Sequence, residues 1–304
     1  MPNTLVHFAT QGAASRSLWR RLDPRWIYLG CLLPDVPWIA RRVAASLGAP
    51  VDPIDLRLYA MAQASLAATL LLCGVFAAVA AAPRLAFSVL GFNALVHLLL
   101  DACEMKWGNG VHLFTPFSWR MTSFGLISGE GVLMASLSVA GALLGAWELV
   151  RPRLPATGLN LRPSRLAAAG TLLAAYALAP LPFLRSMEAS NSYSVSTLRQ
   201  KEQRRGERVS LDRTTVRRTP DGGLVELWTG EIVRATGAMP EHDARVSLTG
   251  TFLERDLLRV ERFVEHRQHR DWPTYLALAM LSLLWARPYL SGLSPPAPTR
   301  RAAR

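Results

Sequence analysis

The residue types best suited to chemistry lie in the first half of this 304-residue chain. His97 and Asp101 stand four residues apart in an apolar run, so a helix would place an imidazole and a carboxylate on one face. Together these two groups can bind a divalent metal ion. Ionisable side chains are costly in an apolar segment and are functional candidates by default. Taken alone, the pair is equally compatible with a structural hydrogen bond at a helix end.

Two further polar residues precede this pair. Asp35 lies between Pro34 and Pro37, and prolines so close together interrupt a regular helix and can turn the carboxylate inward. His7 opens a short apolar run near the start of the sequence, where a surface position is the alternative interpretation.

A glycine-containing loop follows the pair. It holds Glu104 and His112 and contains the dipeptide Pro116-Phe117. Three of the six histidines are thus gathered with several carboxylates in an otherwise apolar half of the chain. The alternative for His112 is an interfacial position at which it binds no metal.

These features resemble the YdjM-like family, described as LexA-binding, inner-membrane-associated hydrolases with metal-dependent chemistry and distant relatives of zinc-dependent phospholipases C. The resemblance covers about residues 1–125. Its elements are an early histidine, the segment from Gly30 to Asp35, the histidine–aspartate pair and the loop after it. The resemblance implies that a divalent metal ion, most simply zinc, is bound by a set of residues or their close partners: His7, Asp35, His97 and Asp101.

The sequence departs from the family pattern in one element. The family carries a histidine-containing motif between the segment that ends in Pro-Asp and the histidine–aspartate pair. The corresponding stretch of this chain, from Arg57 to Ser65, has no histidine. A ligand is therefore missing unless His112 or Glu104 replaces it.

The function that the resemblance implies is metal-dependent hydrolysis, in which a bound metal ion lowers the pKa of a water molecule. Asp35 or Glu104 would act as the general base. A site at membrane depth would suit a lipid or lipid-linked substrate. The alternative is a non-catalytic membrane scaffold with a degenerate site, and a transporter is less favoured because the sequence shows no internal repeat.

The elements that would position these residues are apolar helices. Hydrophobic residues make up 50% of the chain, and they gather in blocks. Four runs are long enough to cross a bilayer, namely 65–82, 131–150, 166–184 and 275–293. A fifth run, 85–100, contains His97, and a sixth, 26–40, is short and broken by prolines. We expect a mainly α, multi-pass membrane bundle with both termini inside.

A polar module interrupts this pattern before the last apolar run. Residues 206–267 alternate in hydrophobicity, as half-buried strands do, and Pro220-Asp221-Gly222-Gly223 is a strong turn signal. About five short strands favour a small closed barrel, most simply OB-like. We therefore expect a membrane domain over 1–185, a barrel module over 186–272, and a final transmembrane helix with a basic tail over 273–304.

The charge distribution indicates how the chain is oriented in the membrane more than what it binds. The net charge is +12, but residues 187–272 hold 15 Lys and Arg against 14 Asp and Glu. The excess therefore lies beside the apolar segments, where positive charge fixes orientation. We expect a bacterial inner-membrane protein with an extracytoplasmic module. Nucleic acid is not an expected partner, because its binding needs a positive groove.

The three cysteines and the other histidines give weaker indications of a functional site. Cys31, Cys73 and Cys103 have no paired spacing and are expected to be buried, inert thiols. Of the module's three histidines, His242, His266 and His269, the last two lie near the return to the membrane without an acidic or thiol partner in register and are expected to be a solvated interfacial pair.

Overall fold

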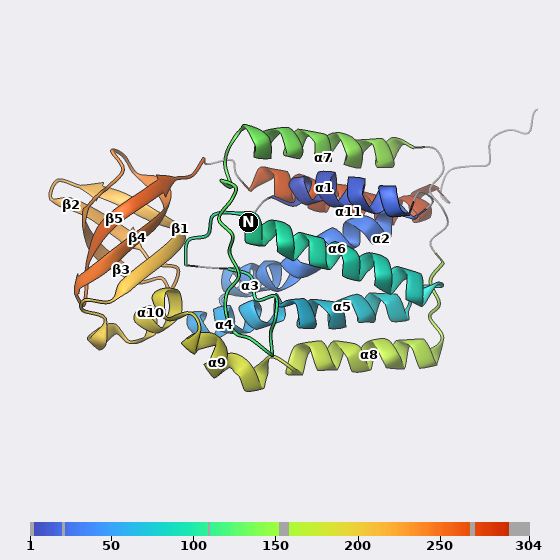
Figure 1. Ribbon diagram of the computed structural model, residues 1–304, viewed down its shortest axis with the longest axis horizontal. Helices are drawn as coiled ribbons and strands as arrows, with labels where there is room; N and C mark the ends of the chain where they lie inside the picture. Colours follow the sequence, from blue (N-terminus) through green and yellow to red (C-terminus); the bar gives the residue numbers. More distant parts are fainter. Residues whose placement is uncertain (1–2, 20–21, 109, 152–157, 268–270, 292–304) are drawn as a thin grey trace, which may run out of the picture.

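The computed structural model describes residues 3–19, 22–108, 110–151, 158–267 and 271–291. It consists of a bundle of long helices with a β-barrel at one end (Figure 1). The helices that run along the bundle are α1 (Thr4–Leu18), α2 (Pro24–Leu32), α5 (Leu66–Ala78), α6 (Pro83–Cys103), α7 (Val132–Val150), α8 (Pro163–Leu178) and α11 (Trp272–Ser291).

Shorter helical segments lie where the bundle meets the barrel. They are η1 (Leu33–Asp35), α3 (Val36–Ser46), α4 (Pro53–Gln63), η2 (Leu181–Phe183), α9 (Leu184–Ala189), η3 (Ser192–Ser196), α10 (Thr197–Arg199) and η4 (Lys201–Gln203). The break expected around Asp35 is confirmed, because α2 gives way there to the 3-10 turn η1 and then to α3.

Three helical segments of the described chain are long and apolar enough to cross a membrane: Pro83–Cys103, Val132–Val150 and Pro163–Ala189. A fourth crossing exists if α4 and α5, which meet at a 70° bend, are counted as one. The predicted run 65–82 does not reach the length alone, since α5 has only 13 residues. The predicted run 275–293 corresponds to α11, which is not among the three.

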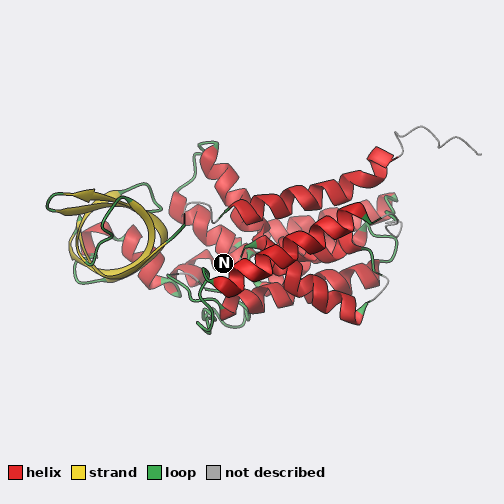
Figure 2. Ribbon diagram, turned by 90° about the horizontal axis from the view of Figure 1, so that it is seen from above, coloured by secondary structure: helices red, strands yellow, loops and turns green. Residues whose placement is uncertain are grey.

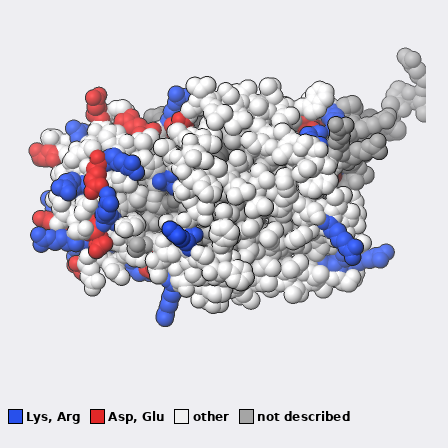
Figure 3. Space-filling view, viewed as in Figure 1, with Lys and Arg blue, Asp and Glu red and all other residues white. Residues whose placement is uncertain are grey.

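Apolar side chains cover much of the outside of the bundle. On α7, for example, Leu143 is 67% exposed and Trp147 is 60% exposed. Figure 3 shows that the middle of the bundle is almost free of charged residues on the face displayed, while Lys and Arg lie toward its two ends. An uncharged belt of this kind suits a lipid environment.

α1 and α11 begin at the same end of the bundle. The backbone N–H of Thr4 lies 3.5 Å from the hydroxyl of Thr274, and both helices run away from the barrel (Figure 1). α1 is a short and partly polar helix, so the sequence did not reveal that it runs along the bundle. The placement of both termini inside stays a prediction.

The polar module is a closed barrel of five strands, which Figure 2 shows end-on. The strands are β1 (Arg208–Thr219), β2 (Gly222–Glu226), β3 (Ile232–Gly237), β4 (Ala244–Glu254) and β5 (Leu257–Glu265), paired in the order β1-β2-β3-β5-β4. Only β3 and β5 pair in parallel. Alternate Val and Leu side chains fill the interior, as the sequence pattern predicts. The closed five-stranded barrel fits the OB-like expectation.

One histidine of the module departs from the expectation of a solvated side chain. His266 is only 6% exposed, with Nδ1 2.6 Å from Oε1 of Glu130 and Nε2 2.7 Å from the Ser247 hydroxyl. His269 lies outside the described residues, and His242, for which no such expectation was made, is 71% exposed. The contact with Glu130 helps to fasten the barrel to the segment between α6 and α7.

Glycines bring the bundle helices into close contact. A Cβ atom on Gly30 of α2 would stand 2.8 Å from Cβ of Asn93 and 3.3 Å from the backbone oxygen of Leu90, both on α6. At Gly141 of α7 it would stand 1.9 Å from the backbone oxygen of Leu5 on α1. Small residues that allow backbones to approach are typical of helix packing in membranes.

Candidate functional site

Two histidines from distant parts of the chain meet at the centre of the bundle. His7 on α1 and His97 on α6 are both fully buried. Their rings stack in parallel, with centroids 3.8 Å apart and an angle of 5° between planes. The close packing of α2 between these helices, with Gly30 against α6, brings the two rings to the same place.

Two carboxylates adjoin the histidine pair. Asp101, one helical turn after His97, places its oxygens 3.6 Å from Nε2 of His7 and 3.8 Å from Nε2 of His97. Asp35, at the break between α2 and α3, places Oδ1 3.6 Å from Nε2 of His97. The structure thus brings together four of the residues that the sequence singles out.

The far side of each ring is held in place. Nδ1 of His97 lies 2.7 Å from the backbone oxygen of Cys31. A carbonyl oxygen only accepts hydrogen bonds, so Nδ1 carries the proton and Nε2 presents its lone pair. The amide nitrogen of Gln11, one turn along α1, lies 2.9 Å from Nδ1 of His7 and donates to it, so Nε2 of His7 carries the proton in this arrangement. If the amide is turned over, the Gln11 oxygen, which has no partner in the described chain, accepts from Nδ1 and leaves Nε2 free. A ring N–H donated to an oxygen, as in His97, is typical of metal ligands.

The near side of the cluster has polar atoms without partners. Within the described part of the chain, Nε2 of His7, Nε2 of His97 and Oδ1 of Asp101 are buried and have no hydrogen-bond partner. The distances of 3.6 Å and 3.8 Å to neighbouring atoms are too long for hydrogen bonds. Buried polar groups are almost always satisfied in proteins, so this convergence calls for an explanation.

One ligand atom from each of these residues can be chosen so that all lie within 4.8 Å of one another, which makes the group a candidate to hold a metal ion. Ligands about 2.0–2.2 Å from a tetrahedral ion are separated from each other by roughly 3.5 Å, so a bound ion would draw these groups closer. The two parallel rings would also have to tilt toward each other, because the lone pair of an imidazole nitrogen lies in the plane of its ring. Two imidazoles and a carboxylate are a donor set that zinc accepts in proteins. The same groups are also close enough to form ion pairs if the histidines are protonated.

Glu104 and His112 lie outside this three-residue group. Glu104 is buried beside Lys106, whose Nζ is 3.1 Å from Oε2. Burial would lower the pKa of Lys106, but Asp101 and Glu104 raise it above its ordinary value. Lys106 therefore supplies a fixed positive charge next to the cluster, which the sequence pattern did not reveal.

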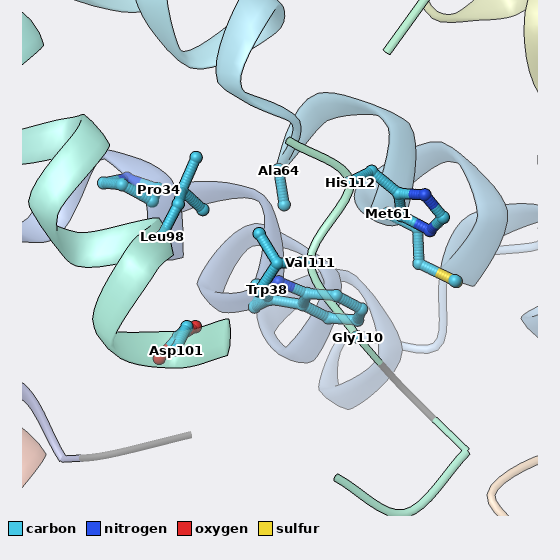
Figure 4. Close-up of a pocket in the computed structure, with 9 residues that line it drawn as sticks. All are labelled: Pro34, Trp38, Met61, Ala64, Leu98, Asp101, Gly110, Val111 and His112. Atoms are coloured by element: carbon cyan, nitrogen blue, oxygen red, sulfur yellow. The ribbon is translucent and has the colours of Figure 1, made fainter. Parts of the chain in front are cut away.

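His112 lines a small cavity of about 20 Å³ together with Asp101, Trp38 and other residues. In Figure 4 the Asp101 carboxylate and the His112 ring lie at opposite ends of this cavity, with Val111 and Trp38 between them. A cavity of this size holds about one water molecule. Burial lowers the pKa of His112 to about 4, so its ring is neutral near pH 7.

The stretch from Arg57 to Ser65 does not contribute a ligand to the described cluster. It forms most of α4, and its last residue, Ser65, caps α5 through the backbone N–H of Ala68. Gln63 donates to the hydroxyl of Tyr59 at 3.0 Å, away from the histidine pair.

The sequence did not single out the polar residues that support the site. Gln11 is four residues from His7, so helical spacing would have placed both on one face. Asn93 is likewise four residues before His97 and bonds to Ser15 on α1 through its amide, at 2.9 Å. These contacts form a buried polar seam between α1 and α6.

No protein-family model, curated protein or solved structure matches this chain.

Proposed function

We propose that this protein is a metal-dependent hydrolase of the membrane, with the metal held by His7, His97 and Asp101. The observation that carries the proposal is the convergence of three buried atoms without hydrogen-bond partners in the described chain. The fixed tautomer of His97 supports it, because the nitrogen facing the cluster is free to bind a cation. Zinc is the metal that best suits this donor set.

Asp35 is the general base in this proposal. When bound, a zinc ion supplies a Lewis acid and lowers the pKa of a water molecule. The side chain of Asp35 is 15% exposed, whereas those of His97 and Asp101 are closed off from solvent. Asp35 also lines a larger cavity through which a substrate can approach. Glu104 is engaged by Lys106 and is less suited to accept a proton.

The membrane placement rests on the bundle surface and its charges. Arg16 ends α1, and Arg162 and Arg165 begin α8, at the end opposite the barrel (Figure 1). Positive residues flank membrane helices mainly on the cytoplasmic side, so this end would be cytoplasmic in a bacterial inner membrane. The barrel and the open side of the site would then face outward, where a lipid or lipid-linked substrate can reach them.

Metal analysis of the purified full-length protein in detergent tests the metal site. We expect about one zinc ion per chain, lost in His97→Ala and in Asp101→Ala. His242→Ala, which changes an exposed histidine of the barrel, should keep the metal. Absence of stoichiometric metal, with the same content in all variants, would overturn the proposal.

Hydrolysis is tested separately with a chromogenic phosphodiester or ester. Asp35→Asn should retain zinc but lose on the order of 10²- to 10⁴-fold in rate, the usual contribution of a general base. Equal rates for this variant and the wild type would exclude Asp35 from that role.

A non-catalytic scaffold is the second candidate. The distances among His7, His97 and Asp101 also allow a cluster of ion pairs without metal. In that case the cluster would hold α1 and α6 together, and the barrel would bind a partner. Metal-free protein that is as stable as protein supplied with zinc would favour this candidate.

A further inference from the structure

A second polar site lies where the bundle meets the barrel. A cavity of about 600 Å³ is bounded by α3, α4 and the start of α11 on one side and by barrel residues on the other. Its volume is typical of sites for small molecules. Asp35 and Trp38 line it, and Asp35 also lies 3.6 Å from His97, so this one side chain connects the wall of the cavity with the candidate metal site.

The cavity is lined by arginines, and only some of them are neutralised. Arg213 of β1 lies 3.3 Å from Asp212 and 3.4 Å from Asp271, which hold its pKa above the ordinary value although burial opposes this. Arg245 lies 3.7 Å from the same Asp271. The barrel arginines are therefore paired with the acidic residues of the wall.

Three arginines on the bundle side have no such partners. Arg41, Arg42 and Arg57 line the cavity and form no ion pair with any residue that the structure describes. Since Asp35 is the only acidic residue that the bundle helices contribute to the lining, this wall carries excess positive charge.

Arg57 is the central residue of this group. It is only 6% exposed, and its guanidinium lies over the ring of Trp228 from the barrel, 4.5 Å from the ring centroid. Its Nε has no hydrogen-bond partner in the described chain, and the same holds for Nε of Arg41. Stacking on an aromatic ring leaves the N–H groups in the guanidinium plane available to an acceptor. An unpaired buried charge is costly, which indicates that an anion completes the site.

Phosphate is the anion that this arrangement suits best. Arginine presents a planar fork of donors that matches phosphate oxygens in pairs. A terminal phosphate has three strong acceptor oxygens, enough for several converging arginines, whereas a carboxylate has two.

We propose that the cavity between bundle and barrel binds a phosphate group through Arg41, Arg42 and Arg57. The binding of phosphate depends on these three arginines alone. That the phosphate belongs to the substrate rests on the proposed hydrolase function, since Asp35 joins this cavity to the metal site. The phosphate is then either a lipid headgroup or that of a soluble molecule.

Calorimetric titration of the full-length protein with inorganic phosphate, in a phosphate-free buffer, tests the site. The titration is repeated after chelation of metal, so that binding to the arginines is distinguished from binding to an ion. We expect binding in both states, weakened at least about tenfold by Arg42→Gln or Arg57→Gln, since each removes a charged donor. Arg42 is exposed, so its variant should fold even if the buried Arg57 variant does not.

Arg185→Gln is the matched control, because Arg185 is an exposed arginine of α9 that does not line the cavity. Co-sedimentation with vesicles identifies the source of the phosphate. Vesicles with phosphatidic acid that bind in an Arg42-dependent way, compared with pure phosphatidylcholine, would indicate a lipid headgroup. Binding of inorganic phosphate without this difference would indicate a soluble ligand.

Three results would overturn the proposal. The first is that phosphate binds neither before nor after chelation of metal. The second is that the Arg42 and Arg57 variants bind phosphate as the wild type does, and the third is that acetate binds as tightly as phosphate. Failure of the metal analysis alone would contradict the proposed hydrolase and leave the phosphate site standing.

Discussion

The imidazole rings of His7 and His97 stack in parallel at 3.8 Å, although they come from the first and the sixth α-helices of the chain. Two protonated rings at this distance would repel each other, so a doubly charged pair needs a shared counter-ion, whereas two neutral rings can stack or bind a cation between them. Asp101 contacts both rings and is the residue whose replacement best separates these two explanations.

Asp101→Asn keeps the shape of the side chain and removes its charge. If the cluster holds zinc, we expect metal affinity to fall by at least about 10- to 100-fold, since one ligand of three is weakened. A chelator should then lower the melting temperature of the wild type but not of the variant, because only the wild type is stabilised by bound metal. If the chelator affects neither protein, while the substitution still lowers stability, the cluster is a metal-free ion-pair network.

Gln11→Leu removes the amide that holds Nδ1 of His7. We expect zinc affinity to fall by about 10- to 100-fold while the fold is kept, as is usual for a contact behind a ligand. Competition with a fluorescent chelator measures the affinity. Gln63→Leu is the control, because Gln63 is also buried but bonds to Tyr59 away from the site. Equal losses in both variants would indicate a general packing defect.

Gly30→Ala should disturb the site indirectly. The added methyl group would meet Asn93 at 2.8 Å and the backbone of α6, so α2 must shift and carry with it the Cys31 carbonyl that orients His97. We expect a loss of stability of about 1–3 kcal/mol and weaker zinc binding. Gly170→Ala, where a methyl group meets nothing within 4 Å, should leave both unchanged. Thermal unfolding and metal analysis in detergent measure the two effects.

His112 should make the protein sensitive to mild acid. Its pKa is about 4 in the folded protein against 6.5 for an ordinary histidine, because burial disfavours the charged ring. The unfolded chain therefore binds the proton first as the pH falls below 6.5, and folded stability decreases until the pH reaches about 4. His112→Gln should flatten the dependence of melting temperature on pH across this interval. The same change at exposed His242 should not, and identical profiles for both variants and the wild type would contradict the assignment.

The sequence predicts the parts of the site that follow from local patterns. The spacing of His97 and Asp101 and the prolines around Asp35 place these residues correctly, because each depends only on helix geometry. The barrel follows in the same way from the alternation of residues such as Val209 and Leu211, which fill its core.

What the sequence could not predict depends on contacts between distant segments. The predicted span 65–82 is shortened because α5 already ends at Ala78, and α5 reaches the length of a crossing only when it is counted with α4, from which it is bent by 70°. The arginine-lined cavity joins Arg57 of α4 to Trp228 of the barrel, and neither residue has a local signal for the other. Lys106 was missed for the same reason.

The barrel is placed within the chain before its last helix, and this placement bears on biosynthesis. α11 packs against α1, α2 and α7, and its residues Leu281 and Leu284 lie in one apolar cluster with Phe8 of α1 and Tyr28 of α2. Because α11 follows the barrel in the chain, this cluster is complete only after the whole barrel has been synthesised. The helix that carries His7 therefore obtains part of its packing surface late in synthesis.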